Sequence, residues 1–183
     1  MPKSGKPIGQ EFGLFVGAAG VVKPEFYRAN TAWNGSPLKW ILTLPSGSKG
    51  ALGKRLVSQW CALKGLSVGR SPDSEADITV EGRRVEVKFS TLWKDGTYTF
   101  QQIRNQNYEY CICLGISPFE AHCWVVSKKI LMQHVIGHMG QHTGSHAQET
   151  AWFGFKPKSP PAWIAPCGGS LKRAYTVLRS LGH

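Results

Sequence analysis

No run of apolar residues in the sequence approaches the ~18 that a membrane-spanning helix requires. The first residues also lack the apolar stretch of a signal peptide. We therefore expect a cytoplasmic protein with no membrane partner. Composition excludes a disordered chain, because 42% of the residues are apolar and 11% are aromatic, enough to fill a core. The length of 183 residues fits one compact domain with at most a small appendage.

The sequence also lacks the cysteine pairs that are typical of disulfides or zinc sites. The five cysteines are an odd number and contain no Cys-x-x-Cys pair, and two of them, Cys111 and Cys113, lie in an apolar run typical of a strand. This pattern favours buried, reduced thiols over disulfides or a zinc site.

Acidic residues are scarce, since eleven Asp and Glu accompany 22 Lys and Arg, for a net charge of +11. Residues 1–70 carry a net +8 and residues 111–183 a net +5, whereas residues 71–110 carry seven acids against five bases. A basic chain around a local acidic segment suits a protein that binds a polyanion and holds divalent cations. Basicity alone is weak evidence, because many ribosomal and membrane-surface proteins share it.

The chain has two parts that differ in periodicity. Residues 1–48 mix Gly, Pro and aromatic residues without a sustained period, which predicts an irregular N-terminal arm or a small lobe. Residues 49–183 are the expected main domain, which begins with a helix over 49–64 that Gly65 ends. The apolar stripe of this helix consists of Leu52, Leu56, Trp60 and Leu63.

Local patterns predict the remaining elements. They are strands over 76–80 and 83–89, a helix over 101–108, strands over 110–116 and 122–126, a helix over 127–135, a Gly/His-rich loop over 137–146, a strand over 151–155 and a final helix from about Ser170. This order predicts an α/β or α+β fold with a central mixed β-sheet flanked by helices.

The predicted hairpin over 76–89 brings charged residues together. With a two-residue turn at Glu81-Gly82, the antiparallel register places Asp77 directly opposite Glu86. Lys88 lies two residues further along the same face, because strand side chains alternate. The reverse face is apolar and is expected to pack against the core; it consists of Ile78, Val80, Val85, Val87 and Phe89.

Directly opposed carboxylates repel each other, which costs stability unless a cation or a proton lies between them. Mg²⁺ prefers hard oxygen ligands and retains several waters, so Asp77 and Glu86 are candidate ligands for this metal. A metal there stabilises charge on a phosphate and lowers the pKa of an attacking water. Lys88 is then placed to polarise that water or to hold the scissile phosphate.

This arrangement resembles the PD-(D/E)xK nuclease superfamily, whose active site is an acid on one strand of a hairpin and Glu-x-Lys on the next. The matching text runs from Asp77 to Lys88, and the stretches that follow as far as Arg104 are similar to small restriction endonucleases. The resemblance covers roughly residues 49–136. It implies a restriction-endonuclease-like fold, a catalytic set of Asp77, Glu86 and Lys88, Mg²⁺ as cofactor and double-stranded DNA as substrate.

One departure from the family pattern concerns the first acid. Ala76, not Pro, precedes Asp77, while a literal Pro-Asp occurs at Pro72-Asp73. The hairpin register favours Asp77. Asp73 and Glu75 are then candidates for outer ligands or for ligands of a second metal.

A second departure lies on the preceding helix. Several relatives carry a glutamate there, where this chain has Lys54 and Arg55, which favours one metal over two. In several relatives polar residues on the helix after the hairpin support the site, and here these are Gln101 or Gln102.

Candidate DNA contacts come from several segments. The amide-rich segment 101–107 suits reading base edges or holding phosphates, with a solvated helix face as the plain alternative. Histidines recur every four residues from His134 to His146, but glycines interrupt them, so a loop, with or without DNA contact, is favoured over a metal-binding helix. The candidate contacts are Lys54, Arg55, Arg104, Asn105, Asn107, Lys128, Lys129, His138 and His142.

These observations together predict a type II-like restriction endonuclease of a restriction-modification system, acting on double-stranded DNA as a two-fold homodimer. Two alternatives stay open: a repair, recombination or phage nuclease that selects DNA structure, and a basic DNA-binding protein whose hairpin is catalytically silent. The hairpin itself has a plain alternative, in which Glu and Lys simply decorate a solvent-exposed face.

Overall fold

The computed structural model describes residues 10–26, 30–140 and 150–182. The chain divides into two units, Met1–Asn34 and Gly35–His183, and each is described by itself. No helix within the described ranges combines the length and the apolar content of a membrane span.

The first unit contains a regular helix, where the sequence predicted an irregular arm over residues 1–48. Helix α1 spans Gln10–Phe26, and a 3-10 helix, η1, spans Thr31–Trp33. The described side chains of α1, at residues 10–21, are exposed and include Phe12 and Phe15. Its segment 12–22 is uncharged on every side, so it shows no apolar stripe, and a search for helical periodicity therefore misses it.

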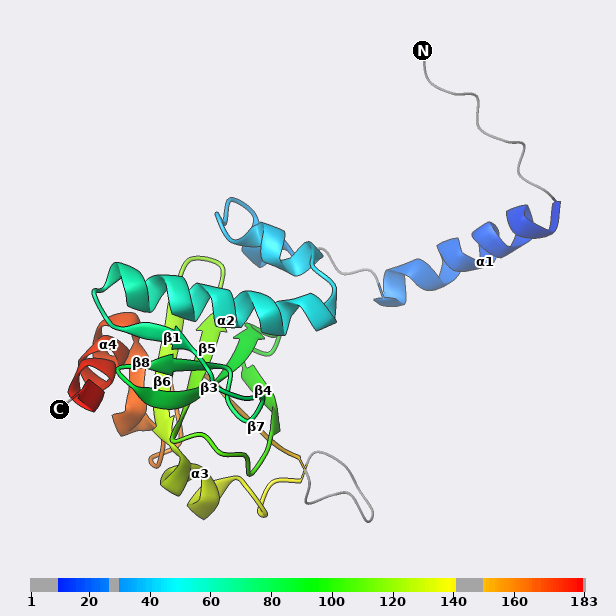
Figure 1. The fold of residues 1–183 in the computed structure, drawn as a ribbon. Coiled ribbons are helices and arrows are strands. Elements are labelled where there is room, and N and C mark those ends of the chain that lie inside the picture. The colour runs from blue at the N-terminus through cyan, green and yellow to red at the C-terminus, as the bar shows by residue number, and fades with distance from the viewer. Residues whose placement is uncertain (1–9, 27–29, 141–149, 183) are drawn as a thin grey trace. The chain divides into compact units, whose positions relative to one another are not determined.

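The second unit is built around a six-stranded sheet in the order β1-β2-β3-β5-β6-β8 (Figure 1). Its strands are β1 Val68–Arg70, β2 Ile78–Val80, β3 Arg83–Thr91, β5 Tyr110–Ile116, β6 Ala121–Ser127 and β8 Gly168–Ser170. β3 and β5 pair in parallel, and all other neighbours pair antiparallel. The predicted α+β fold with a mixed sheet flanked by helices is confirmed.

Helix α2, Ser46–Leu63, covers one face of this sheet and begins three residues before the predicted start (Figure 1). Gly65 follows its end with φ +76°, as expected for a terminating glycine. The buried row is not the predicted stripe, because it runs one residue later along the chain, and Leu63 is 84% exposed. This row consists of Gly53, Val57 and Cys61. The missing side chain of Gly53 lets the helix approach Phe89 of β3 closely.

The other face of the sheet is covered by a second layer. Strands β4, Tyr98–Ile103, and β7, Ala151–Phe155, form a two-stranded antiparallel sheet, which we call the β4–β7 ribbon. Their inward aromatic side chains, among them Tyr98, Phe100 and Phe153, pack with Trp124 in one buried cluster. The predicted strand over 151–155 is confirmed, whereas the predicted helix over 101–108 is wrong, because residues 98–103 form β4.

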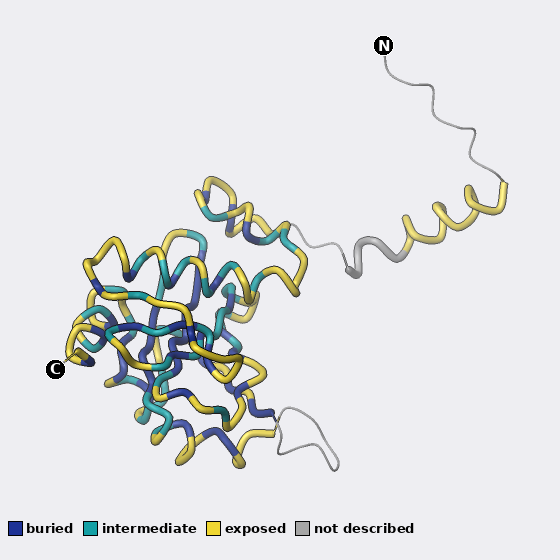
Figure 2. The backbone as a smooth tube through the Cα atoms, in the orientation of Figure 1, coloured by how far each residue is buried: buried dark blue, intermediate teal, exposed yellow. Residues whose placement is uncertain are grey.

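Shorter elements complete the second unit. Helices α3, Lys128–His134, and α4, Leu171–Arg179, begin after Ser127 and Ser170, whose side chains accept hydrogen bonds from backbone N–H groups in the first turn. The remaining 3-10 helices are η2 Lys39–Thr43, η3 Ala165–Cys167 and η4 Ser180–Gly182. All five cysteines are unpaired and buried, as predicted. Buried residues follow the sheet strands and the inner side of α2 (Figure 2).

Substitution of Gly53 by alanine should destabilise the protein. An added Cβ would lie 2.5 Å from Cβ of Phe89, so strand or helix must shift. We expect a loss of about 1–3 kcal/mol in the free energy of unfolding, measured by urea denaturation. The control is Gly50→Ala on the same helix, where nothing lies within 4 Å and a gain of ~0.5–1 kcal/mol is expected. Equal responses at the two positions would contradict the close packing at Gly53.

Candidate active site

The hairpin of β2 and β3 has the register predicted from the sequence. Its turn residues, Glu81 and Gly82, both have positive φ, as a type I′ turn requires. Ile78 and Val85 are the last pair of this register, and Asp77 and Glu86 are the next residues beyond it on the two strands. The backbone N–H of Asp77 donates to the Val85 carbonyl at 3.0 Å, which holds Asp77 against β3.

The carboxylate of Asp77 is held by the neighbouring strand. Its Oδ2 accepts a hydrogen bond from the backbone N–H of Val87 at 2.9 Å. Its Oδ1 forms an ion pair with Nζ of Lys54, on α2, at 2.8 Å. Asp77 therefore has one oxygen fixed by the backbone and the other paired with a side chain that belongs to a different element.

Glu86 has its own cation. Nζ of Lys88 lies 2.6 Å from Oε1 of Glu86, and the two side chains are only 14% and 13% exposed. Asp77, Glu86, Lys54 and Lys88 are called the charge cluster from here on. Two carboxylates and two ammonium groups balance its charge, which offsets the repulsion expected between directly opposed carboxylates.

Burial raises the pKa of Glu86 above its ordinary value, and the nearby carboxylate of Asp77 adds to this effect. The ammonium of Lys88 is the main opposing influence, with a smaller one from Lys54. The charged form of Glu86 therefore depends on its lysine neighbours.

The charge cluster does not lie on an open face. In the parallel pairing of β3 with β5, Glu86 is level with Cys111 and Lys88 with Cys113. Tyr108, which is 2% exposed, is close enough for the charge of Glu86 to raise the pKa of its phenol, although burial is the larger cause. Solvent-exposed Glu and Lys, the plain alternative for this hairpin, do not describe this site, because the second layer covers much of the face.

Asp73 and Glu75 lie in a neighbouring group rather than between Asp77 and Glu86. Nη2 of Arg84 lies 2.5 Å from Oδ1 of Asp73, and this guanidinium lowers the pKa of that carboxyl. Oε2 of Glu75 accepts the backbone N–H of Asn107 at 3.3 Å. These contacts tie residues 73–75 to Arg84 and to the loop after β4. Within the described part of the chain, no three His, Cys, Asp or Glu side chains form a group that could hold a metal.

Gln101 and Gln102 lie on β4 instead of the predicted helix. The register of β4 with β7 shifts between Phe100 and Ile103. The two glutamines of β4 therefore lie across from a single residue of β7, Trp152. This is a β-bulge, and Gln102 has the positive φ of +55° that such irregularities tolerate. Both glutamine side chains are exposed.

Some of the other predicted DNA contacts are exposed, and others already pair with groups of the protein. Lys54 is paired with Asp77, and Nζ of Lys128 donates to the Gln106 carbonyl at 2.5 Å beneath the Tyr108 ring. The exposed candidates are Arg55, Arg104, Asn105, Asn107, Lys129 and His138. His142 lies outside the described residues, as does most of the predicted Gly/His-rich loop.

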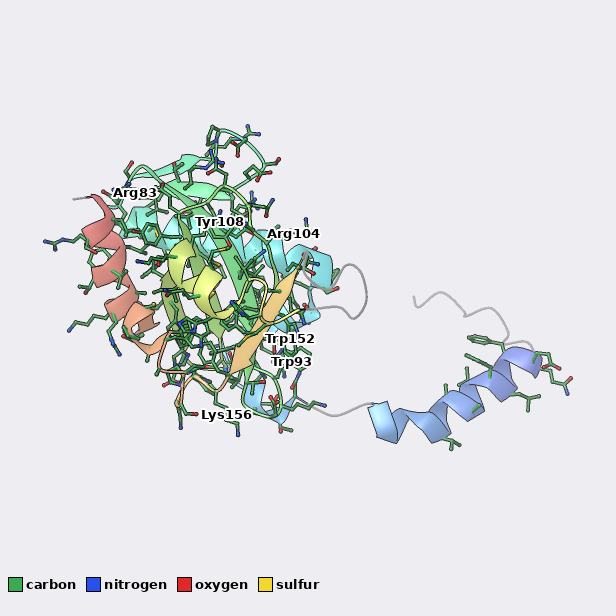
Figure 3. The ribbon with its side chains drawn as sticks, turned by 90° about the horizontal axis from the view of Figure 1, so that it is seen from below. Arg83, Trp93, Arg104, Tyr108, Trp152 and Lys156 are labelled. Atoms are coloured by element: carbon green, nitrogen blue, oxygen red, sulfur yellow. The ribbon has the colours of Figure 1, made fainter. Side chains whose placement is uncertain are left out.

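Two exposed tryptophans were not recognised from the sequence as surface residues. Trp152, on β7, is 43% exposed, and Trp93, in the turn before β4, is 57% exposed. Figure 3 looks onto the side of the molecule where these two side chains are seen with Arg104 and Lys156. The exposure of Trp152 follows from β7, which buries alternate residues and turns Trp152 outward.

No protein-family model and no curated protein matches the sequence. Nine chains of solved structures match, including a bacterial homing endonuclease, I-Ssp6803I. That match has 13% sequence identity and a TM-score of 0.49, and it covers 75% of this chain and 94% of the other. The resemblance to PD-(D/E)xK nucleases stays a prediction.

Replacing Lys88 by methionine should raise the pKa of Glu86 further, because Lys88 is the largest influence that lowers it. The raised folded-state pKa means that folded protein binds the proton more tightly than unfolded protein. The stability contributed by Glu86 is therefore highest below its unfolded pKa and falls as pH rises through the folded pKa. Carbon-13 NMR titration of the Glu86 carboxyl measures the shift. Lys129→Met, an exposed lysine, is the control, and an unchanged Glu86 titration in Lys88→Met would contradict the pairing.

Proposed function

We propose that the chain is a Mg²⁺-dependent endonuclease that hydrolyses phosphodiester bonds in double-stranded DNA at specific sequences, as type II restriction endonucleases do. One observation carries the proposal: Asp77 and Glu86 lie just beyond the last pair of the hairpin, near enough for their charges to interact, and Lys88 is within contact of Glu86. Two carboxylates can hold a metal that assists phosphodiester hydrolysis, and a lysine beside them can stabilise the charge that develops on the phosphate.

The donor set fits a magnesium ion. Asp77 and Glu86 offer carboxylate oxygens, which Mg²⁺ prefers, and two protein ligands leave positions for water and a substrate phosphate. When bound, Mg²⁺ would neutralise charge on the phosphate and make a bound water more acidic. The backbone N–H of Val87 orients Asp77, while Lys88 opposes the rise that burial causes in the pKa of Glu86 and presents an ammonium for the phosphate or the attacking water.

Charge and shape support DNA as the partner. The net charge of +11 favours a polyanion, and the exposed Arg55, Arg104 and Lys129 are positioned on surfaces that a phosphate backbone can reach. The β4–β7 ribbon exposes Gln101 and Trp152 on its outer side. A two-stranded ribbon fits the major groove of B-DNA, where an amide side chain pairs with adenine. A palindromic target would be cut by a two-fold homodimer.

Cleavage of a long mixed-sequence DNA in the presence of Mg²⁺ or EDTA tests this proposal. Wild type should yield discrete fragments only with Mg²⁺, and Asp77→Ala and Lys88→Ala should bind DNA but cut at least ~10²-fold more slowly. Asp73→Ala is the matched control, because Asp73 belongs to the literal Pro-Asp yet contacts Arg84, and it should retain activity.

The other outcomes select among the alternatives. Full activity in Asp77→Ala, with loss in Asp73→Ala, would overturn the site. Cleavage confined to junctions, flaps or ends would indicate a nuclease that selects DNA structure. Salt-sensitive DNA binding with no Mg²⁺-dependent product, over a range of salts and metals, would indicate a DNA-binding protein with a silent hairpin.

Replacing Arg104 by alanine should weaken binding to all DNA sequences to a similar extent. Arg104 is exposed beside the ribbon, so its loss removes about one phosphate contact and should lower the slope of log affinity against log salt by about 1. Electrophoretic mobility shifts over a series of salt concentrations measure this slope. The control is Arg179→Ala on α4, which contacts β6 and β8 rather than the ribbon. An equal change in both variants would contradict a DNA surface at the ribbon.

A further inference from the structure

Lys54 takes part in the charge cluster in an unexpected way. It was predicted as a DNA contact, but its Nζ lies 2.8 Å from Oδ1 of Asp77. Because Oδ2 of Asp77 is already bonded to the Val87 N–H, Lys54 covers the oxygen that the backbone leaves available. A metal that binds Asp77 through Oδ1 therefore competes with the Lys54 ammonium.

The two lysines of the cluster differ in their freedom to move. Lys88 is 14% exposed and pairs with a carboxylate that is 13% exposed, so separating this pair would leave poorly solvated charges. Lys54 is 43% exposed and its partner Asp77 is 23% exposed. An ion pair that water reaches contributes little and separates easily. Lys54 is thus the cation that can leave.

We propose that Lys54 occupies the divalent-cation position of Asp77 in the metal-free protein and yields it to Mg²⁺, after which its ammonium is released toward a DNA phosphate. The inference rests on the proposed nuclease function and deepens its metal site. It assigns to one lysine both the neutralisation of Asp77 before metal binding and a phosphate contact afterwards.

Charge balance supports this exchange. With both lysines in place the cluster is neutral, so adding Mg²⁺ without moving a lysine would leave two excess positive charges beside each other. Moving Lys54 away leaves one excess positive charge, which a DNA phosphate offsets. By linkage, the pairing that must be broken weakens Mg²⁺ binding, and any phosphate that draws Lys54 away strengthens it.

The experiment is a titration of the full-length protein with MgCl₂ in the absence of DNA, in which isothermal calorimetry measures the dissociation constant. Lys54→Met removes the competing cation and should bind Mg²⁺ roughly three- to tenfold more tightly than wild type. Lys54→Arg should bind it more weakly than wild type, because guanidinium pairs with carboxylate through two hydrogen bonds. The control is Arg55→Met, the adjacent exposed cation, which should shift the dissociation constant by less than about twofold.

The results separate this inference from the proposed function. Opposite shifts in Lys54→Met and Lys54→Arg support the exchange, and urea unfolding shows that both variants are folded. Mg²⁺ binding that is lost in Asp77→Asn yet equal in wild type and both Lys54 variants would overturn the exchange while the metal site stands. Absence of Mg²⁺ binding in every variant would overturn the proposed metal site and, with it, this inference.

Discussion

The structure depends on the pairing of charged side chains on strand β3, because this strand is covered on both faces. β3 pairs with β2 and β5, lies under α2 on one face and lies beneath the second layer on the other. Glu86 and Lys88 face that second layer and are nearly buried. Poorly solvated charges must be paired, so the mutual contact of Glu86 and Lys88 is a condition for the strand to occupy this place.

The same constraint shapes what the site can do chemically. Carboxylates that are partly removed from water interact more strongly with a cation than exposed ones would. Lys54 and Lys88 offset their mutual repulsion, and burial keeps the pKa of Glu86 raised despite these two lysines. A divalent cation that displaces Lys54 would therefore take over the part of this charge balance that Lys54 supplies.

Local patterns were sufficient for the hairpin and insufficient for its surroundings. The register of Asp77 and Glu86 followed from a two-residue turn, because pairing in a hairpin is set by the turn. β4 was mistaken for a helix because the bulge at Gln101 and Gln102 interrupts the alternation that marks a strand. The contact of Lys54 with Asp77 could not be predicted, since it depends on where α2 crosses the sheet, which no spacing within the helix specifies.

The position of Lys54 follows from the packing of its neighbour. Gly53 lies where α2 approaches β3 so closely that an added Cβ would be 2.5 Å from Cβ of Phe89. Lys54 is the next residue, so the close approach that seats the helix also brings its ammonium within reach of Asp77. A side chain at position 53 would lift the helix and lengthen that ion pair. The charge balance of the candidate site is therefore set partly by the core on the opposite face of the sheet. The absence of a side chain at Gly53 permits both the packing of α2 on β3 and the ion pair of Lys54 with Asp77.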